Sequence, residues 1–133
     1  MEQTLSIIKP DAIERNLDNE IKQMFKDKGF SIINEKKIQI EKSEAEKFYK
    51  VHETKPFYND LCAYLSSGPI VVMVLEKENA VLANRDLMGA TNPTDAEEGT
   101  IRKKYGISID KNSVHGSDSV ENAKKEIDFF FKD

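Results

Sequence analysis

The run of six apolar residues from Ile70 to Leu75 constrains the fold of this chain more than any other segment. A continuous apolar run of this length, preceded by the Gly68-Pro69 turn, predicts a strand at the buried centre of a sheet. A strand of this kind requires further strands at its edges and helices over its faces. The run therefore predicts a layered α/β domain.

Three other segments are predicted to be strands. Leu5 and Ile7 alternate with polar residues, which indicates a first strand that ends before Lys9-Pro10. Residues 30–40 are expected to form a long, partly exposed strand, because Phe30, Ile32, Ile38 and Ile40 share one parity. A short strand near Val114 is expected to complete the sheet.

Segments with helical periodicity lie between these strands and after the last one. Helices are predicted at residues 17–28, from residue 43 onward, at 57–65, at 78–88, as a short turn at 100–105, and over the last residues around Val120 to Phe130. The spacings Ser43–Glu46 and Asp118–Glu121 fit capping boxes at two helix starts. The resulting β-α-β-α-β-α-β-α order predicts an α/β sandwich, and residues 1–133 are expected to be a single domain.

Composition excludes several classes of function. The net charge of −4 disfavours a general binder of nucleic acid or of anionic membranes, so neither partner is expected. No apolar run approaches the roughly 18 residues of a membrane span, and the N-terminus lacks a signal-peptide pattern. Cys62 is the only cysteine, which favours a reducing compartment, so we expect a cytoplasmic protein.

His115 is the first candidate for chemistry. Its imidazole is largely neutral at pH 7 and can act as a nucleophile. We predict that it lies just before a helix N-terminus, whose positive end favours anions such as phosphate. Gly116 would let the backbone approach a substrate closely. From the residue alone, a capping or surface histidine is the more common interpretation.

Three cations could form an anionic-ligand pocket with this histidine. Lys9, Arg85 and Arg102 occupy unusual positions, although each also has an ordinary explanation, namely a snorkelling lysine, an ion pair and a solvated charge run. The aperiodic stretch between Gly89 and Gly116 favours a binding loop. Neither G-x-x-x-x-G-K-[ST] nor G-x-G-x-x-G occurs, so a P-loop ATPase and a protein kinase are disfavoured.

Nearly the whole chain resembles the nucleoside diphosphate kinase family. The family's motifs occur in its order: Thr4-Leu5-Ser6-Ile7-Ile8-Lys9-Pro10-Asp11, Lys55-Pro56-Phe57, Ser67-Gly68-Pro69, Gly89-Ala90-Thr91-Asn92-Pro93, Gly99-Thr100-Ile101-Arg102 and Asn112-Ser113-Val114-His115-Gly116-Ser117-Asp118-Ser119. The resemblance implies a ferredoxin-like fold with a four-stranded antiparallel sheet covered by helices. It also implies a kinase that passes the γ-phosphoryl group of a nucleoside triphosphate to a nucleoside diphosphate by a ping-pong mechanism through a phosphohistidine on His115.

The resemblance assigns further roles residue by residue. Catalysis would involve His115, Lys9, Glu126 and Ser117, with Glu126 and Ser117 orienting the imidazole. Nucleotide binding would involve Lys9, Tyr49, Phe57, Leu61, Arg85, Thr91, Arg102, Ile109 and Asn112. Mg²⁺ would arrive with the nucleotide, because no dedicated metal site is visible. A homo-oligomer is expected, as a dimer, tetramer or hexamer.

Two alternatives remain open at this point. One is a catalytically silent, nucleotide-binding regulatory protein of the same fold. The other is a phosphohistidine relay to proteins, for which a base-stacking Phe57 would be superfluous.

Overall fold

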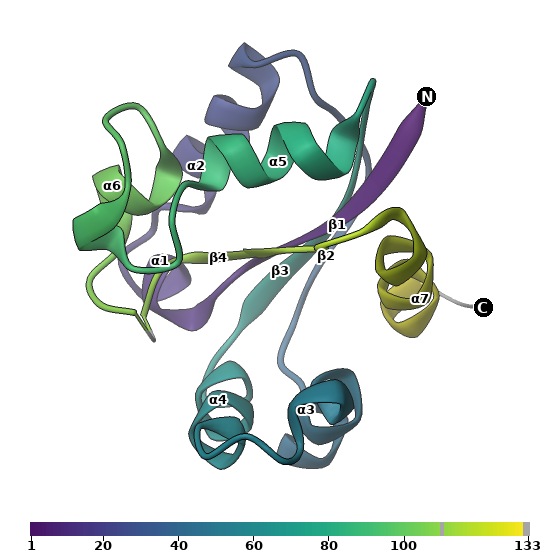
Figure 1. Ribbon diagram of the computed structural model, residues 1–133, viewed down its shortest axis with the longest axis vertical. Helices are drawn as coiled ribbons and strands as arrows, with labels where there is room; N and C mark the ends of the chain where they lie inside the picture. Colours follow the sequence, from purple (N-terminus) through teal and green to yellow (C-terminus); the bar gives the residue numbers. More distant parts are fainter. Residues whose placement is uncertain (110, 132–133) are drawn as a thin grey trace.

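The strands form one antiparallel sheet in the computed structural model, which describes residues 1–109 and 111–131 (Figure 1). The strands are β1 (Glu2–Ile8), β2 (Ser31–Ile38), β3 (Ile70–Lys77) and β4 (Val114–Gly116), and their order in the four-stranded sheet is β2-β3-β1-β4. The apolar run 70–75 lies in β3, between β2 and β1, and all six residues are buried. The predicted fold class is therefore confirmed.

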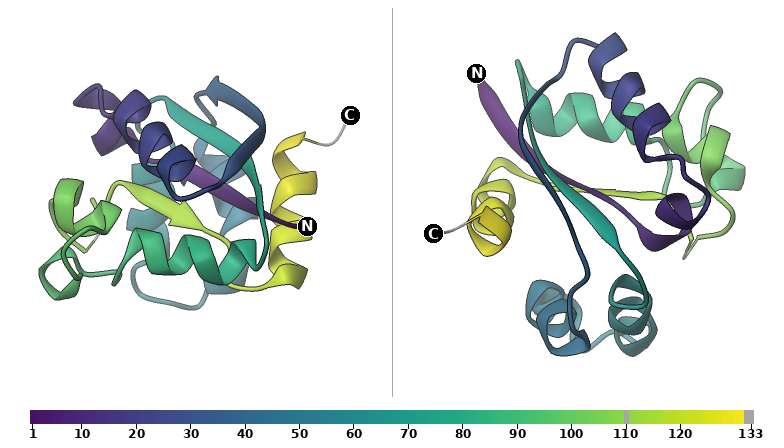
Figure 2. Two further views of the ribbon diagram at one scale, coloured as in Figure 1. Left: turned by 90° about the horizontal axis from the view of Figure 1, so that it is seen from above. Right: turned by 180° about the vertical axis from the view of Figure 1, so that it is seen from behind.

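Helices cover both faces of the sheet (Figures 1 and 2). One apolar core lies under α1 (Pro10–Glu14), α2 (Asp18–Asp27), α5 (Ala80–Met88) and α6 (Ile101–Tyr105). The other lies under α3 (Lys42–Phe48), α4 (Tyr58–Leu65) and α7 (Val120–Phe131). Two short 3₁₀ helices, η1 (Lys50–His52) and η2 (Pro93–Asp95), lie in connections. Each face of the sheet therefore packs against an apolar core, and the sheet is buried on both sides.

Helix α1 has no counterpart among the predicted helices. Its five residues are too few to show periodicity, but Pro10 stands at its first turn, where the fixed φ of proline favours a helix start. The helix begins at Pro10, almost directly after β1 ends at Ile8. It thereby places Lys9 and Asp11, which flank Pro10, in the interior at 5% exposure each.

Strand β2 departs from the simple parity prediction. Ile32 packs against the α2/α5 core, whereas Ile38 and Ile40 belong to the α3/α4 core on the opposite face. The pairing with β3 shifts between Ile32 and Asn34, so Ile33 is an extra residue on β2. A bulge of this kind exchanges the faces of the strand, and for this reason residues of one parity reach both cores.

Both predicted capping boxes are wrong in position. Helix α3 begins one residue before Ser43, and its capping box joins Glu41 and Glu44. At the start of α7, the Ser119 hydroxyl accepts a hydrogen bond from the Asn122 amide at 3.0 Å, so Ser119 is the capping side chain in place of Asp118. Ser117, Asp118 and Ser119 are all residue types that cap helices well, and the packing of the folded chain decides which of them does so.

Within residues 1–109 and 111–131, no helix has the length and apolar character needed to cross a membrane.

Candidate active site

His115 lies in β4, where it pairs with Ile7 of β1. The prediction that it directly precedes a helix N-terminus is wrong, because α7 begins five positions later, at Val120. The imidazole instead contacts the middle of α7, where its Nε2 atom lies 3.1 Å from Oε1 of Glu126. The strand therefore fixes the histidine backbone, and a helix fixes its ring.

Glu126 joins His115 to Ser117. The Ser117 hydroxyl donates to the same Oε1 atom at 2.9 Å, and it also accepts a hydrogen bond from the Leu5 amide at 3.3 Å. A carboxylate beside Nε2 favours the tautomer that carries its proton on Nε2. The lone pair of Nδ1 is then free, and about a fifth of the His115 side chain is exposed to receive a substrate.

Aromatic rings form one wall of the site. Phe48 and Tyr49 present ring edges to His115 at centroid distances of 5.3 and 6.2 Å. His52 lies 6.2 Å from Tyr49 and 6.0 Å from Phe57, so a row of rings leads outward from His115. Sequence reasoning missed Phe48 and His52 as site residues because their helical spacing is equally typical of core residues.

Burial changes the properties of Tyr49. Loss of solvent raises the pKa of its hydroxyl well above the ordinary value, and the nearby Cys62 and Glu126 add to the effect. Tyr49 therefore stays a neutral hydrogen-bonding group at neutral and moderately alkaline pH. A hydroxyl in this state can donate to an anionic ligand without adding negative charge.

Lys9 and Asn112 form a buried polar pair beside the aperiodic loop. The Lys9 ammonium donates to Oδ1 of Asn112 at 2.9 Å. The Asn112 amide nitrogen donates to the carbonyl of Thr91 at 3.0 Å and to that of Ile109 at 3.2 Å. Four of the residues predicted for nucleotide binding therefore meet at one point.

Arg102 connects this region to the histidine strand. Its guanidinium donates to the carbonyl of Gly89 at 3.0 Å and to that of Val114, the residue before His115, at 2.9 Å. Its buried Nε atom has no hydrogen-bond partner among residues 1–109 and 111–131. Burial, followed by the positive charge of Arg85, lowers the pKa of Arg102 to about 10. A desolvated cation with a spare donor is well suited to an anionic ligand.

The remaining predicted residues lie nearer the surface. Phe57 and Ile109 are about half exposed, at 46 and 55%. Leu61 is partly buried against the α3/α4 core. Arg85, on α5, is exposed and lines a groove together with Thr91 and Arg102, whereas His115 and Tyr49 line a second hollow between α3 and α7. The structure thus places Arg85, Thr91 and Arg102 at one hollow and His115 and Tyr49 at the other, and Arg102 reaches Val114, the residue before His115. Phe57 and Leu61 line neither of these two hollows.

The donor set favours phosphate oxygens over a bare metal ion. In the part of the chain that the structure describes, no three histidine, cysteine or acidic side chains lie close enough together to hold a metal. The buried charged groups beside the loop are the cations Lys9 and Arg102 and the carboxylate of Asp11, and that carboxylate accepts hydrogen bonds from Ser113, Arg15 and Tyr64.

Comparison with known proteins gives one consistent result. A family model described as nucleoside diphosphate kinase matches residues 2–133. The nucleoside diphosphate kinase of Nitratiruptor sp. is 59% identical over 131 residues, which are 98% of this chain and 96% of the relative. That of Campylobacter jejuni (strain RM1221) is 58% identical over 132 residues, which are 99% of this chain and 96% of the relative. A crystal structure of the Aquifex aeolicus nucleoside diphosphate kinase superposes with a TM-score of 0.97 at 39% identity, covering 98% of this chain and 95% of that one.

Proposed function

The chain belongs to the nucleoside diphosphate kinase family, and we propose from this premise that His115 carries the phosphoryl group between its substrates. The chain is an enzyme that transfers phosphoryl groups between nucleotides. A catalytically silent regulatory protein is not favoured, because curated relatives at 56 to 59% identity are named as the kinase.

One observation carries the proposal: the contact between Nε2 of His115 and the carboxylate of Glu126. With the proton on Nε2, the lone pair of Nδ1 attacks the γ-phosphorus of a nucleoside triphosphate. The bond between that phosphorus and the β,γ-bridging oxygen breaks, and the nucleoside diphosphate departs with the electron pair. A terminal oxygen of a second diphosphate then attacks the phosphohistidine, and the imidazole is restored.

Charge stabilisation follows from the neighbouring residues. Phosphoryl transfer has a loose transition state, so positioning and electrostatics supply most of the rate. Arg102 and Lys9 provide fixed positive charge, Tyr49 provides a neutral donor, and Asn112 holds the Lys9 ammonium in place. Glu126 stabilises the positive charge that the imidazole acquires when Nδ1 attacks, because its carboxylate faces the ring.

The remaining predicted residues would hold the base and the outer phosphates. Phe57, with Leu61 and Ile109, would hold the base by stacking, which tolerates different bases, and Arg85 and Thr91 would contact phosphates. Mg²⁺ would be held by the nucleotide's own phosphate oxygens and would neutralise part of their charge.

A labelling experiment tests the central step. The protein is incubated with γ-labelled ATP and Mg²⁺, quenched in alkali and mapped by mass spectrometry, and then chased with a different diphosphate. We expect acid-labile, alkali-stable label on His115 that moves to the diphosphate. Measurable ATP binding without any label on His115 would contradict the proposal.

Two further proposals concern the setting of the enzyme. We expect a homo-oligomer, built from dimers, and the β2 edge strand with its half-exposed Ile33 gives copies of the chain an unpaired edge to associate through. Light scattering of the purified chain measures this directly. We also propose a cytoplasmic location, which fits the single buried Cys62.

A further inference from the structure

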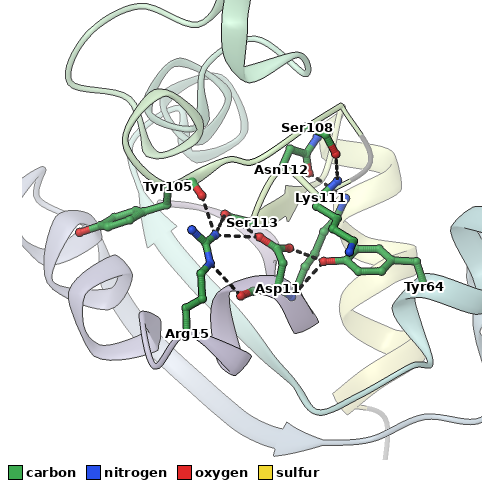
Figure 3. Close-up of polar contacts among 9 residues, drawn as sticks. Asp11, Arg15, Tyr64, Tyr105, Ser108, Lys111, Asn112 and Ser113 are labelled. Atoms are coloured by element: carbon green, nitrogen blue, oxygen red, sulfur yellow. Dashed lines mark hydrogen bonds and ion pairs between the residues drawn. The ribbon is translucent and has the colours of Figure 1, made fainter.

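Asp11 is a buried carboxylate that the phosphoryl-transfer step does not use. Its side chain is 3% exposed. Oδ2 accepts hydrogen bonds from the Ser113 hydroxyl at 2.9 Å and from Arg15 at 3.1 Å, and Oδ1 accepts from the Tyr64 hydroxyl. Figure 3 shows the carboxylate enclosed by these three side chains, of which Arg15 directly follows α1, Tyr64 lies in α4 and Ser113 lies in the loop before β4.

Ser113 adopts a backbone conformation that needs support. Its φ is +76°, and the amide of Val114 donates to the carbonyl of Asn112 at 2.9 Å. Together these define a γ-turn with positive φ, which is rare and strained for a residue with a side chain. Strain of this kind persists only where the surroundings hold the residue in place.

The support comes from two residues on either side of Pro10. The Lys9 amide donates to the Ser113 carbonyl at 2.8 Å, and Asp11 accepts from the Ser113 hydroxyl. Arg15 binds Asp11 and also donates to Ser113 and to the Tyr105 carbonyl, at 3.2 and 2.6 Å. The turn is therefore fixed through its backbone and through its side chain.

The turn lies between two residues of the proposed site. Asn112, which accepts from Lys9, directly precedes it, and β4 with His115 directly follows it. A change in the Ser113 torsions would rotate Asn112 and the start of β4 relative to each other. Arg102 would move too, because it is bound to the Val114 carbonyl.

We propose that Asp11 is a positioning residue that holds the strained turn at Ser113, and through it sets the geometry of Asn112 and His115. This inference rests on the proposed role of His115 as the phosphorylated residue. Asp11 is not expected to contact the nucleotide or its phosphates. It acts through Ser113, while Tyr64 and Arg15 hold its carboxylate in place.

The test measures single-turnover phosphorylation of His115 at saturating γ-labelled ATP and Mg²⁺. The variants are Asp11→Asn, Ser113→Ala and the double variant, with Asp27→Asn as the matched control. Asp27 is an exposed carboxylate on α2 that accepts one hydrogen bond, from Gln23 at 2.8 Å. We expect each single variant to slow labelling by about ten- to a hundredfold at a temperature where it is folded, because small displacements of reacting groups have effects of this size.

A purely structural role would lower the melting temperature and leave the maximal labelling rate of the folded protein unchanged. The double variant is expected to be no slower than the slower single variant, because both changes break one connection. Folded single variants that label at the wild-type rate would overturn the inference, and so would fully additive effects.

Asp11→Asn could prevent folding, since it weakens three contacts at once. Ser113→Ala then decides the question, because it leaves the contacts of Asp11 with Arg15 and Tyr64 in place. The wild type separates the two proposals. An unlabelled wild-type His115 refutes the proposed function, whereas labelled wild type with equally fast variants refutes only the positioning role.

Discussion

At the scale of single residues, the site depends on a few contacts that give ordinary side chains specific states. Glu126 directs the proton of His115 to Nε2, and burial keeps Tyr49 neutral. Burial also leaves Arg102 with an Nε donor that has no partner within the described part of the chain, and it lowers the pKa of the guanidinium. The neutral Tyr49 and the spare Arg102 donor are the states that we expect an anionic ligand to use.

Replacing His115 by alanine is expected to abolish phosphoryl transfer, because it removes the imidazole whose Nδ1 would accept the phosphoryl group. Binding of ADP should persist, since the cations and Phe57 are unchanged. Steady-state assays and calorimetric titration measure the two quantities. His52→Ala is the matched control, as it removes the only other histidine and must still be labelled on His115. Loss of ADP binding in a folded His115→Ala protein would argue against a purely nucleophilic role.

Glu126→Gln keeps the shape of the side chain and removes its charge. Turnover should fall by roughly ten- to a hundredfold, since a charge-assisted hydrogen bond contributes about 1.5–3 kcal/mol and each ~1.4 kcal/mol is a factor of ten. Ser117→Ala, which leaves the charge in place, should have a smaller effect. Measuring kcat for both variants tests this order, and the reverse order would show that charge is not the main contribution of Glu126.

At the scale of elements, the three-residue strand β4 depends on close contact with α5. An added Cβ on Gly116 would lie 2.7 Å from Cε of Met88 and closer still to the buried amide of Asn84. The glycine is therefore needed for helix packing against the strand, which differs from the substrate approach expected from its sequence position. The packing holds the strand that presents His115.

Gly116→Ala should consequently lower both stability and activity. Overpacking of this kind costs about 1–3 kcal/mol, and relief by moving β4 would displace His115. Urea unfolding measures the change in stability, and steady-state assays measure the change in turnover. Gly68→Ala is the matched control, because its Cβ would meet only Pro10, at an ordinary 3.6 Å. Equal stability of the two variants would contradict the close contact described here.

At the scale of the whole molecule, net charge and local charge have opposite signs. The chain carries −4 overall, yet the charged groups buried at the site include Lys9 and Arg102. The fold brings these cations together from positions far apart in the sequence, since Lys9 directly follows β1 and Arg102 lies in α6. Long-range repulsion of an anionic nucleotide is therefore expected to be offset by short-range attraction to these two cations.

Whole-molecule stability is expected to fall between about pH 10 and 12. Burial raises the pKa of Tyr49 and of Tyr64, so the unfolded chain loses these protons first and binds fewer of them. The lowered pKa of Arg102 acts in the opposite direction, because the folded chain loses that proton first. Burial also raises the pKa of Cys62 and of Tyr58, so the groups that lower stability outnumber Arg102 and the net slope is a loss.

Urea unfolding at a series of alkaline pH values measures this slope. Tyr49→Phe should flatten this slope, because it removes a tyrosine whose raised pKa acts against the effect of Arg102. Tyr105→Phe, at a partly exposed position, is the matched control. A slope that rises with pH in the wild type would show that Arg102 outweighs the tyrosines.

The sequence by itself determined the central strand, the order of the elements and the group of site residues. The apolar run 70–75 had no favourable place outside a buried strand, and ordered motifs identified His115, Arg102 and Asn112. These features are local, so a linear pattern is enough to show them.

Only the tertiary structure decided the rest. The bulge at Ile33 reversed the faces of β2, and His115 lay in a strand away from the N-terminus of α7. The anchoring of Ser113 by Asp11 joins residues 102 positions apart. Such contacts depend on how strands pair and helices pack, and the free energy that selects them is shared by many distant residues. For that reason no single segment of the sequence shows them.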